Sequence, residues 1–302
     1  MKQNILTLWD LKRTDIDEII QHALSLKINR IKYSGHQPLT GKTIGLLFEK
    51  ASTRTRISFE TAMNQLGGSV IYLNPNDTQI SRNEPIKDTA RVLSAYLDAI
   101  VIRTYSQQLI EEMASWSRIP VINALTDMYH PCQILSDVLT IVEKRNTYAD
   151  LNIAWVGDGN NVAHSWINNA AILGLNLTLA CPKDYMPSSE IIQNAQKNGI
   201  GRIKLTTDPI EAVTGADVIN TDVWASMGQE SELAERKQIF QPYQVNQSLV
   251  NHAKDQVIVM HCLPAHRGEE ITEDVLEGQH SVVWKQAENK MYVHKAILEK
   301  ML

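Results

Sequence analysis

The chain has 302 residues, of which 43% are hydrophobic and 21% are charged, so it can form a packed core and is not globally disordered. Its formal net charge of −5 argues against a general nucleic-acid binder, which needs a basic surface. The three cysteines do not form a disulfide framework, and the N-terminus has no secretory signal. No run reaches the roughly 20 apolar residues that span a bilayer. We expect a cytoplasmic protein that binds neither nucleic acid nor membranes.

The first half of the chain alternates apolar runs with helical periodicity. An amphipathic helix follows Thr14, which we expect to be its N-cap. Short apolar runs then predict strands at 43–48, 68–73, 99–103 and 120–123. Helical periodicity follows these strands at 56–66, 86–96, 109–116 and 133–144. Strands that alternate with helices predict a parallel sheet.

The same alternation begins again after residue 146. Predicted strands lie at 151–156, 175–180, 203–206, 217–221 and 257–261. Predicted helices lie at 162–173, 189–197, 209–214, 242–253 and 287–302. The fold class that we predict is therefore α/β, with two parallel-sheet α/β domains whose boundary lies near residue 146. We expect domains at 1–146 and 147–285, and a C-terminal helix at 286–302 that returns to the first domain.

The turn after the first predicted strand holds Ser52, Thr53, Arg54, Thr55 and Arg56. A helix N-terminus has free backbone N–H groups and the positive end of the helix dipole, so it favours an anion. Hydroxyl residues alone would indicate ordinary capping. Two arginines oppose the dipole unless an anion lies between them and the helix, and guanidinium groups suit phosphate oxygens. We predict a phosphate site, although no Walker A pattern is present.

Ligands of open α/β sheets bind beyond the carboxyl ends of the strands. After the strands of the first half come Arg103, His130 and Gln133, which suit an oxyanion beside an electrophilic carbonyl. After the strands of the second half come Asp222 for a cation and Cys262 with its thiol. We therefore expect two substrates, one anionic and one amino-acid-like, that meet in the interdomain cleft.

Two alternative kinds of site fit the sequence less well. Residues 157–161 (GDGNN) lack the third glycine of a dinucleotide loop, and no acidic residue ends the next strand. His130 with Cys132, and His261 with Cys262, do not have the spacing of a structural zinc site. We expect neither a cofactor nor a metal ion.

Four motifs occur in a fixed order: FEKASTRTR at 48–56, HPCQ at 130–133, DVWASMGQ at 222–229 and HCLP at 261–264. Together they resemble the aspartate/ornithine carbamoyltransferase superfamily, and the last two are similar to its ornithine branch. The resemblance covers essentially the whole chain. It implies a carbamoyl phosphate-binding domain at 1–146, an ornithine-binding domain at 147–285, and terminal helices that cross between them. It also implies a homotrimer, with any higher assembly left open.

The resemblance also assigns roles to single residues, motif by motif. Arg103, His130 and Cys262 are implied to be catalytic. Gln79 matches a position that reaches into the site of the adjacent subunit. The carbamoyl phosphate-binding residues are implied to be Ser52, Thr53, Arg54, Thr55, Gln79, Arg103, His130, Gln133, Cys262, Leu263 and Lys290. The ornithine-binding residues are implied to be Asn161, Asp222, Ser226 and Met227.

The implied reaction is attack of the neutral δ-amine of ornithine on the carbamoyl carbon, which gives citrulline and phosphate. Whether Cys262 acts as a base, a hydrogen-bond partner or a shape element stays open. Lys290 departs from the family pattern, because the family usually has arginine there, and lysine lacks the bidentate fork. Other acceptors (putrescine, an acylated ornithine or aspartate) and a non-catalytic protein that binds a phosphorylated metabolite are the alternatives.

Overall fold

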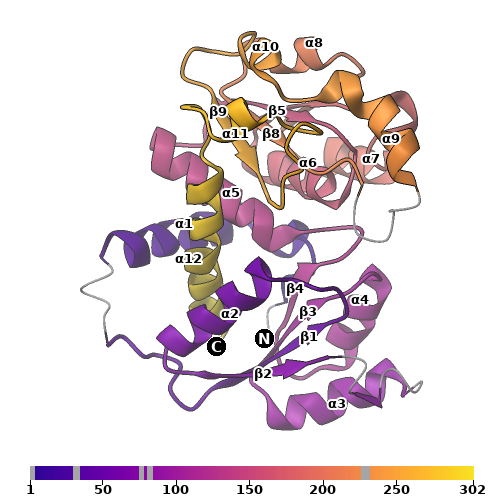
Figure 1. The fold of residues 1–302 in the computed structure, drawn as a ribbon. Helices are drawn as coiled ribbons and strands as arrows, with labels where there is room; N and C mark the ends of the chain where they lie inside the picture. Colours follow the sequence, from indigo (N-terminus) through magenta and orange to yellow (C-terminus); the bar gives the residue numbers. More distant parts are fainter. Residues whose placement is uncertain (1–3, 30–34, 75–77, 80–83, 226–231) are drawn as a thin grey trace. The chain divides into compact units, whose positions relative to one another are not determined.

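The computed structural model describes residues 4–29, 35–74, 78–79, 84–225 and 232–302. The chain divides into two compact units, residues 1–139 with 288–302 and residues 140–287. In each unit, helices flank a sheet of parallel strands (Figure 1), so the predicted α/β fold class is confirmed. None of the helices in the described part of the chain is long and apolar enough to cross a membrane.

The sheet of the first unit has the strand order β2-β1-β3-β4. Its strands are β1 (Thr43–Phe48), β2 (Ser69–Leu73), β3 (Ala99–Arg103) and β4 (Val121–Leu125), and every pair is parallel. The helices of this unit include α1 (Arg13–Ile28), α2 (Arg54–Gln65), α3 (Ile86–Tyr96) and α4 (Gln107–Trp116). Figure 1 shows α2 on one face of the sheet and α3 and α4 on the other. The strand ends at Phe48 and Arg103 therefore lie side by side.

The sheet of the second unit has the order β7-β6-β5-β8-β9. Its strands are β5 (Asn152–Val156), β6 (Asn176–Ala180), β7 (Arg202–Thr206), β8 (Val218–Thr221) and β9 (Ile258–His261). Its helices are α6 (Asn161–Leu173), α7 (Ser189–Asn198), α8 (Pro209–Val213), α9 (Leu233–Phe240), α10 (Gln247–Val250) and α11 (Glu273–Leu276). The pairing of β8 with β5 and β9 brings the ends of these three strands to one edge.

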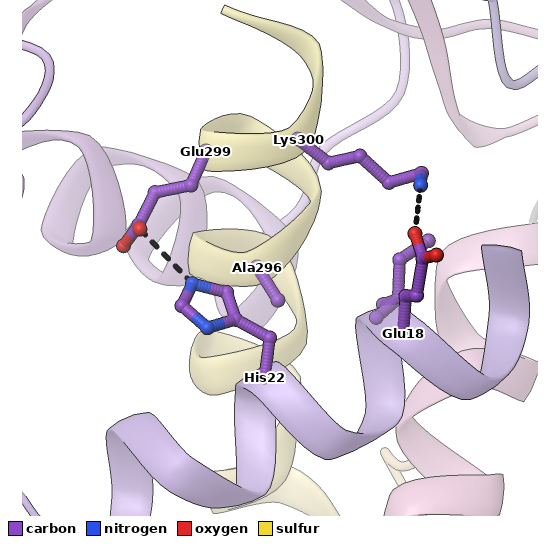
Figure 2. Close-up of a pocket in the computed structure, with 6 residues that line it drawn as sticks. Glu18, His22, Ala296, Glu299 and Lys300 are labelled. Carbon is purple, nitrogen blue, oxygen red and sulfur yellow. Dashed lines mark hydrogen bonds and ion pairs between the residues drawn. The ribbon is translucent and has the colours of Figure 1, made fainter.

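Two long helices carry the chain from one unit into the other, α5 (Pro131–Arg145) and α12 (Val283–Met301). Within the first unit, ion pairs join the last turns of α12 to α1 (Figure 2). Glu299 Oε2 lies 2.9 Å from His22 Nε2, and Lys300 Nζ lies 2.6 Å from Glu18 Oε2. The C-terminal residues are thereby tied to the N-terminal helix.

Two predictions about local structure are wrong. The predicted helix at 242–253 is a 3₁₀ turn (Gln241–Tyr243) followed by α10, because Asn246 caps α10 by accepting from the Leu249 amide at 3.0 Å. Thr14 is not the N-cap of α1, since Lys12 holds that position and its amide donates to Asp15 Oδ2 at 2.9 Å. The helices α9 and α11 were not predicted.

Candidate active site

The predicted phosphate site lies at the start of α2, directly after β1. The N-cap is Thr53, which makes no side-chain capping hydrogen bond. Thr53 is exposed, Ser52 and Arg54 are half-buried, and Thr55 is buried. This turn combines first-turn amides, hydroxyl groups and one guanidinium at the positive end of a helix, which suits an anion.

The second arginine of this turn has a different role. Arg56 Nε donates to Glu60 Oε1 at 2.8 Å, and its guanidinium stacks 3.7 Å from the centroid of the Tyr72 ring. The carboxylate of Glu60 raises the pKa of Arg56 above its usual value. Its charge is therefore balanced within the protein, and the prediction that both arginines need an anion is wrong for Arg56.

A second group of predicted residues lies together in the first unit, at the end of β3, the start of α5 and the middle of α12. Arg103, His130, Gln133 and Lys290 are all buried, with exposed fractions of 7%, 4%, 2% and 5%. Lys290 Nζ donates to Gln133 Oε1 at 3.1 Å. The tertiary structure thus brings a side chain from the C-terminal helix to residues more than 150 positions earlier.

This group carries positive charge, which changes the pKa of His130. Burial lowers the pKa of His130 well below 6.5, and the positive charges of Lys290 and Arg103 lower it further. His130 is therefore a neutral imidazole near pH 7 and can donate one hydrogen bond. Two buried cations beside a neutral donor would stabilise negative charge on a ligand oxygen.

His294, which was not predicted, supports this group. His294 follows Lys290 by one turn of α12, is fully buried, and stacks on Phe59 of α2 with ring centroids 3.6 Å apart. Its Nδ1 lies 3.0 Å from Ser58 Oγ. Burial and the charge of Lys290 lower the pKa of His294 well below 6.5. His294 thus ties α12 to the helix that begins at the phosphate site.

Gln79, the residue predicted to reach an adjacent subunit, is exposed. Its backbone carbonyl accepts from the Glu84 amide at 3.1 Å. Among the described contacts, none joins Gln79 to Arg103, His130 or Lys290. Its predicted role toward an adjacent subunit stays a prediction.

The predicted ornithine residues that the structure describes belong to the second unit. Asp222 follows β8, is 7% exposed, and is contacted by two side chains. Cys262 Sγ donates to Asp222 Oδ1, and Asn160 Nδ2 donates to Asp222 Oδ2, each at 2.9 Å. The association of Asp222 with Cys262 agrees with the roles implied for them. Ser226 and Met227 lie outside the described residues.

Asn160 was missed by the sequence analysis, which singled out its neighbour Asn161. The side-chain oxygen of Asn160 accepts from the amides of Val162 and Ala163 and so caps α6, while its NH₂ group holds Asp222. Asn161 is the first residue of α6 and is buried. The only signal in the sequence was the position of Asn160 before a helical pattern, where asparagine is a preferred cap.

A hydrogen-bonded chain supports the loop that carries Cys262 and Leu263. Leu263 has a φ of 59°, in the left-handed region that leucine seldom adopts. Its amide donates to His261 Nδ1 at 2.9 Å, and His261 Nε2 lies 3.0 Å from Glu270 Oε1. His261 must be protonated on Nε2, because Nδ1 accepts from the amide. His261 and Glu270, which were not predicted, hold this loop in place.

Asp222, His261 and Cys262 have potential metal-ligating atoms within 4.8 Å of one another. Both ring nitrogens of His261 are already engaged, by Leu263 and Glu270. Only a carboxylate and a thiol therefore remain for an ion, which does not make a complete zinc ligand set.

Comparison with known proteins places the chain in a family. Residues 3–143 match the model described as aspartate/ornithine carbamoyltransferase, carbamoyl-P binding domain, and residues 149–301 match the model of the Asp/Orn binding domain of the same family. The chain therefore belongs to the aspartate/ornithine carbamoyltransferase family, which confirms the predicted resemblance.

Similar proteins share the whole length of the chain. An ornithine carbamoyltransferase from Desulfotalea psychrophila is 56% identical over 302 residues, with all of both chains covered. The structure of ornithine carbamoyltransferase from Pyrococcus furiosus is 49% identical, with a TM-score of 0.93 over 98% of this chain and 96% of that one. The anabolic ornithine carbamoyltransferase from Campylobacter jejuni is 40% identical, with a TM-score of 0.93 over 100% and 99%.

We predict that Arg54→Ala will weaken the binding of inorganic phosphate about 10- to 150-fold, because a charge-assisted contact worth about 1.5–3 kcal/mol is lost. The matched control is Arg56→Ala, whose guanidinium is already paired with Glu60, and which should bind phosphate within about twofold of the wild type. Calorimetric titration measures both affinities, and thermal unfolding verifies the fold. Equal losses in the two variants would contradict the assignment of Arg54.

We also predict that the protein loses stability as the pH falls below 6.5. The pKa values of His130 and His294 are lower in the folded state than in the unfolded chain. Below pH 6.5 the unfolded chain therefore binds more protons than the folded protein, and the free energy of unfolding decreases as the pH decreases. Each histidine contributes up to about 1.4 kcal/mol per pH unit. Burial raises the pKa of Asp158 to about 6, which acts in the opposite direction.

The variant His294→Gln isolates one of these protons, since Asp158 and His130 are common to both proteins. Between pH 5 and 6, the free energy of unfolding should fall less steeply in the variant, by up to about 1.4 kcal/mol per pH unit. Urea denaturation at a series of pH values measures the slope. The same slope in both proteins would show that His294 does not stay neutral in the folded state.

Proposed function

We propose that this protein transfers the carbamoyl group of carbamoyl phosphate to the δ-amine of L-ornithine, which yields L-citrulline and phosphate. The observation that carries the proposal is the buried positive group of Arg103, His130 and Lys290 in the first unit. The second unit adds a buried carboxylate, Asp222. Arg103 and Lys290 suit an anionic ligand in charge, and Asp222 suits an ammonium. The similar proteins named above, which are called ornithine carbamoyltransferases, support the same activity.

Carbamoyl phosphate is the ligand that we assign to the first unit. The start of α2 with Arg54 would hold the phosphate, and Arg103, His130 and Lys290 would face the carbamoyl end. Arg103 and the neutral His130 can donate hydrogen bonds to the carbonyl oxygen as negative charge develops there. Lys290 supplies charge without the bidentate geometry of arginine. The amide of Gln133 lies beside it and offers an acceptor for the carbamoyl NH₂ group.

Ornithine is the ligand that we assign to the second unit. Asp222 would bind its α-ammonium, and Asn161, Ser226 and Met227 would bind its carboxylate. An ammonium that takes the place of the Cys262 thiol on Asp222 would leave that thiol beside the substrate. The exchange links the binding of ornithine to the position of Cys262.

In the reaction, the δ-nitrogen forms a bond to the carbamoyl carbon, the C–O bond to phosphate breaks, and the leaving phosphate carries away the electron pair. The amine must first lose a proton to solvent, because an alkylammonium with a pKa of about 10.4 is not a nucleophile. After the C–N bond forms, the nitrogen loses a second proton, which the leaving phosphate can take. The site contributes alignment and charge stabilisation, since carbamoyl phosphate is already activated. Assembly as a homotrimer stays a prediction of the family resemblance, and a cytoplasmic location stays a prediction of the composition.

Measuring phosphate release with a panel of amines tests the acceptor. We expect release with carbamoyl phosphate and L-ornithine, and rates at least about 100-fold lower with putrescine, N-acetylornithine or aspartate. Putrescine lacks the carboxylate that Asn161 and Met227 would bind, N-acetylornithine leaves Asp222 without its ammonium, and aspartate brings a second carboxylate toward Asp222. Citrulline is quantified in parallel. Release only with putrescine would overturn the assigned acceptor, and no release with any amine would favour a binding protein.

The role of Asp222 can be tested separately from the carbamoyl phosphate site. Asp222→Asn keeps the shape but removes the charge, so the KM for ornithine should rise about 100-fold while carbamoyl phosphate binding stays within about twofold. Asp217→Asn is the matched control, since Asp217 is equally buried but pairs with Lys254 at 2.8 Å. The control should lower thermal stability and leave the KM unchanged. An unchanged KM in Asp222→Asn would contradict the ornithine assignment.

A further inference from the structure

Asp137 is a fully buried carboxylate in α5 that has no role in the reaction described above. It follows Gln133 by one turn of the helix, and its neighbours Ile134, Leu135 and Val138 are also buried. A buried carboxylate is costly unless it is hydrogen-bonded. Asp137 Oδ1 accepts from Gln133 Nε2 at 2.8 Å. The carboxylate is thus in direct contact with a residue of the positive group.

The two neighbours of Gln133 determine how its amide is oriented. On one side Asp137 Oδ1 accepts from Gln133 Nε2 at 2.8 Å, and on the other side the ammonium of Lys290, 3.1 Å from Oε1, can only donate. A reversed amide would place oxygen against carboxylate and NH₂ against ammonium. The oxygen of Gln133 therefore faces the positive group, and its NH₂ faces Asp137.

This orientation matters for the ligand. Arg103, His130 and Lys290 offer donors, which suit the oxygen atoms of any acyl phosphate. The oxygen of Gln133 adds an acceptor, which suits the NH₂ that a carbamoyl group has and an acetyl group lacks. A ligand that lacks this NH₂ group leaves a polar group of the desolvated site without a hydrogen bond. The site can therefore discriminate strongly against such a ligand.

We propose that Asp137 is a positioning residue, which holds the amide oxygen of Gln133 toward the ligand and so makes the site prefer carbamoyl phosphate to other acyl phosphates. This inference rests on the proposed function. Asp137 acts through Gln133 and does not itself contact the ligand.

The test is the variant Asp137→Asn, with binding of carbamoyl phosphate, acetyl phosphate and inorganic phosphate measured by calorimetric titration. Asparagine can donate as well as accept, so Asp137→Asn removes one of the two contacts that oppose reversal of the Gln133 amide, while the contact with Lys290 remains. The preference for carbamoyl phosphate over acetyl phosphate should fall about tenfold, which corresponds to about 1.4 kcal/mol. Affinity for inorganic phosphate should stay the same or increase, because a negative charge near the cations is removed.

Two further variants separate positioning from a general loss of structure. Ser136→Ala removes a hydrogen bond from the same turn of α5, Ser136 Oγ to the Cys132 carbonyl at 2.9 Å, and should leave the preference unchanged. Gln133→Ala should lose the preference by itself, and adding Asp137→Asn to it should change the preference less than about twofold. The Gln133→Ala result does not depend on whether Asp137→Asn folds.

Each outcome decides the inference. If Asp137→Asn weakens the binding of all three ligands equally, or strengthens it equally, Asp137 acts through the general structure or through its charge. Either result overturns the inference. A full effect of Asp137→Asn in the Gln133→Ala background, or a retained preference in Gln133→Ala, also overturns it. The proposed function is tested by the wild type alone: binding of neither carbamoyl phosphate nor inorganic phosphate would overturn that function, and this inference with it.

Discussion

Two buried cations, Arg103 and Lys290, lie beside the neutral imidazole of His130. The site of the first unit depends on this arrangement. Removing such charges from water costs several kcal/mol each unless they are compensated. The fold compensates Lys290 in part through Gln133, and Gln133 through Asp137. An anionic ligand at this group would be attracted by the same two charges.

The topology explains how these residues meet. A parallel sheet places the carboxyl ends of its strands along one edge, so Arg103 at the end of β3 lies next to the turn after β1. His130 and Gln133 are at or near the start of α5, which follows β4. Lys290 arrives from α12, whose C-terminal part belongs to the first unit. The stacking of His294 on Phe59 fixes α12 against α2, so the positive group and the phosphate turn are held by the same contact.

The second unit uses the opposite charge and the same kind of support. Asp222 is oriented by Asn160 and Cys262, and the loop that carries Cys262 is held by His261 and Glu270. In both units a side chain that would contact a ligand is oriented by a buried polar residue behind it. Geometry that is set before the ligand binds lowers the cost of ordering the site.

The sequence by itself determined the α/β class, nearly all of the strands and the motif residues at their ends, because hydrophobic periodicity and turn residues act locally. It also identified the departure at Lys290, which needs only the printed letters. Only the tertiary structure decided that Arg56 pairs with Glu60, that Asn160 contacts Asp222, and that Asp137 and His294 support the positive group. These facts depend on which side chains become neighbours after folding. A buried aspartate and an exposed one are written with the same letter.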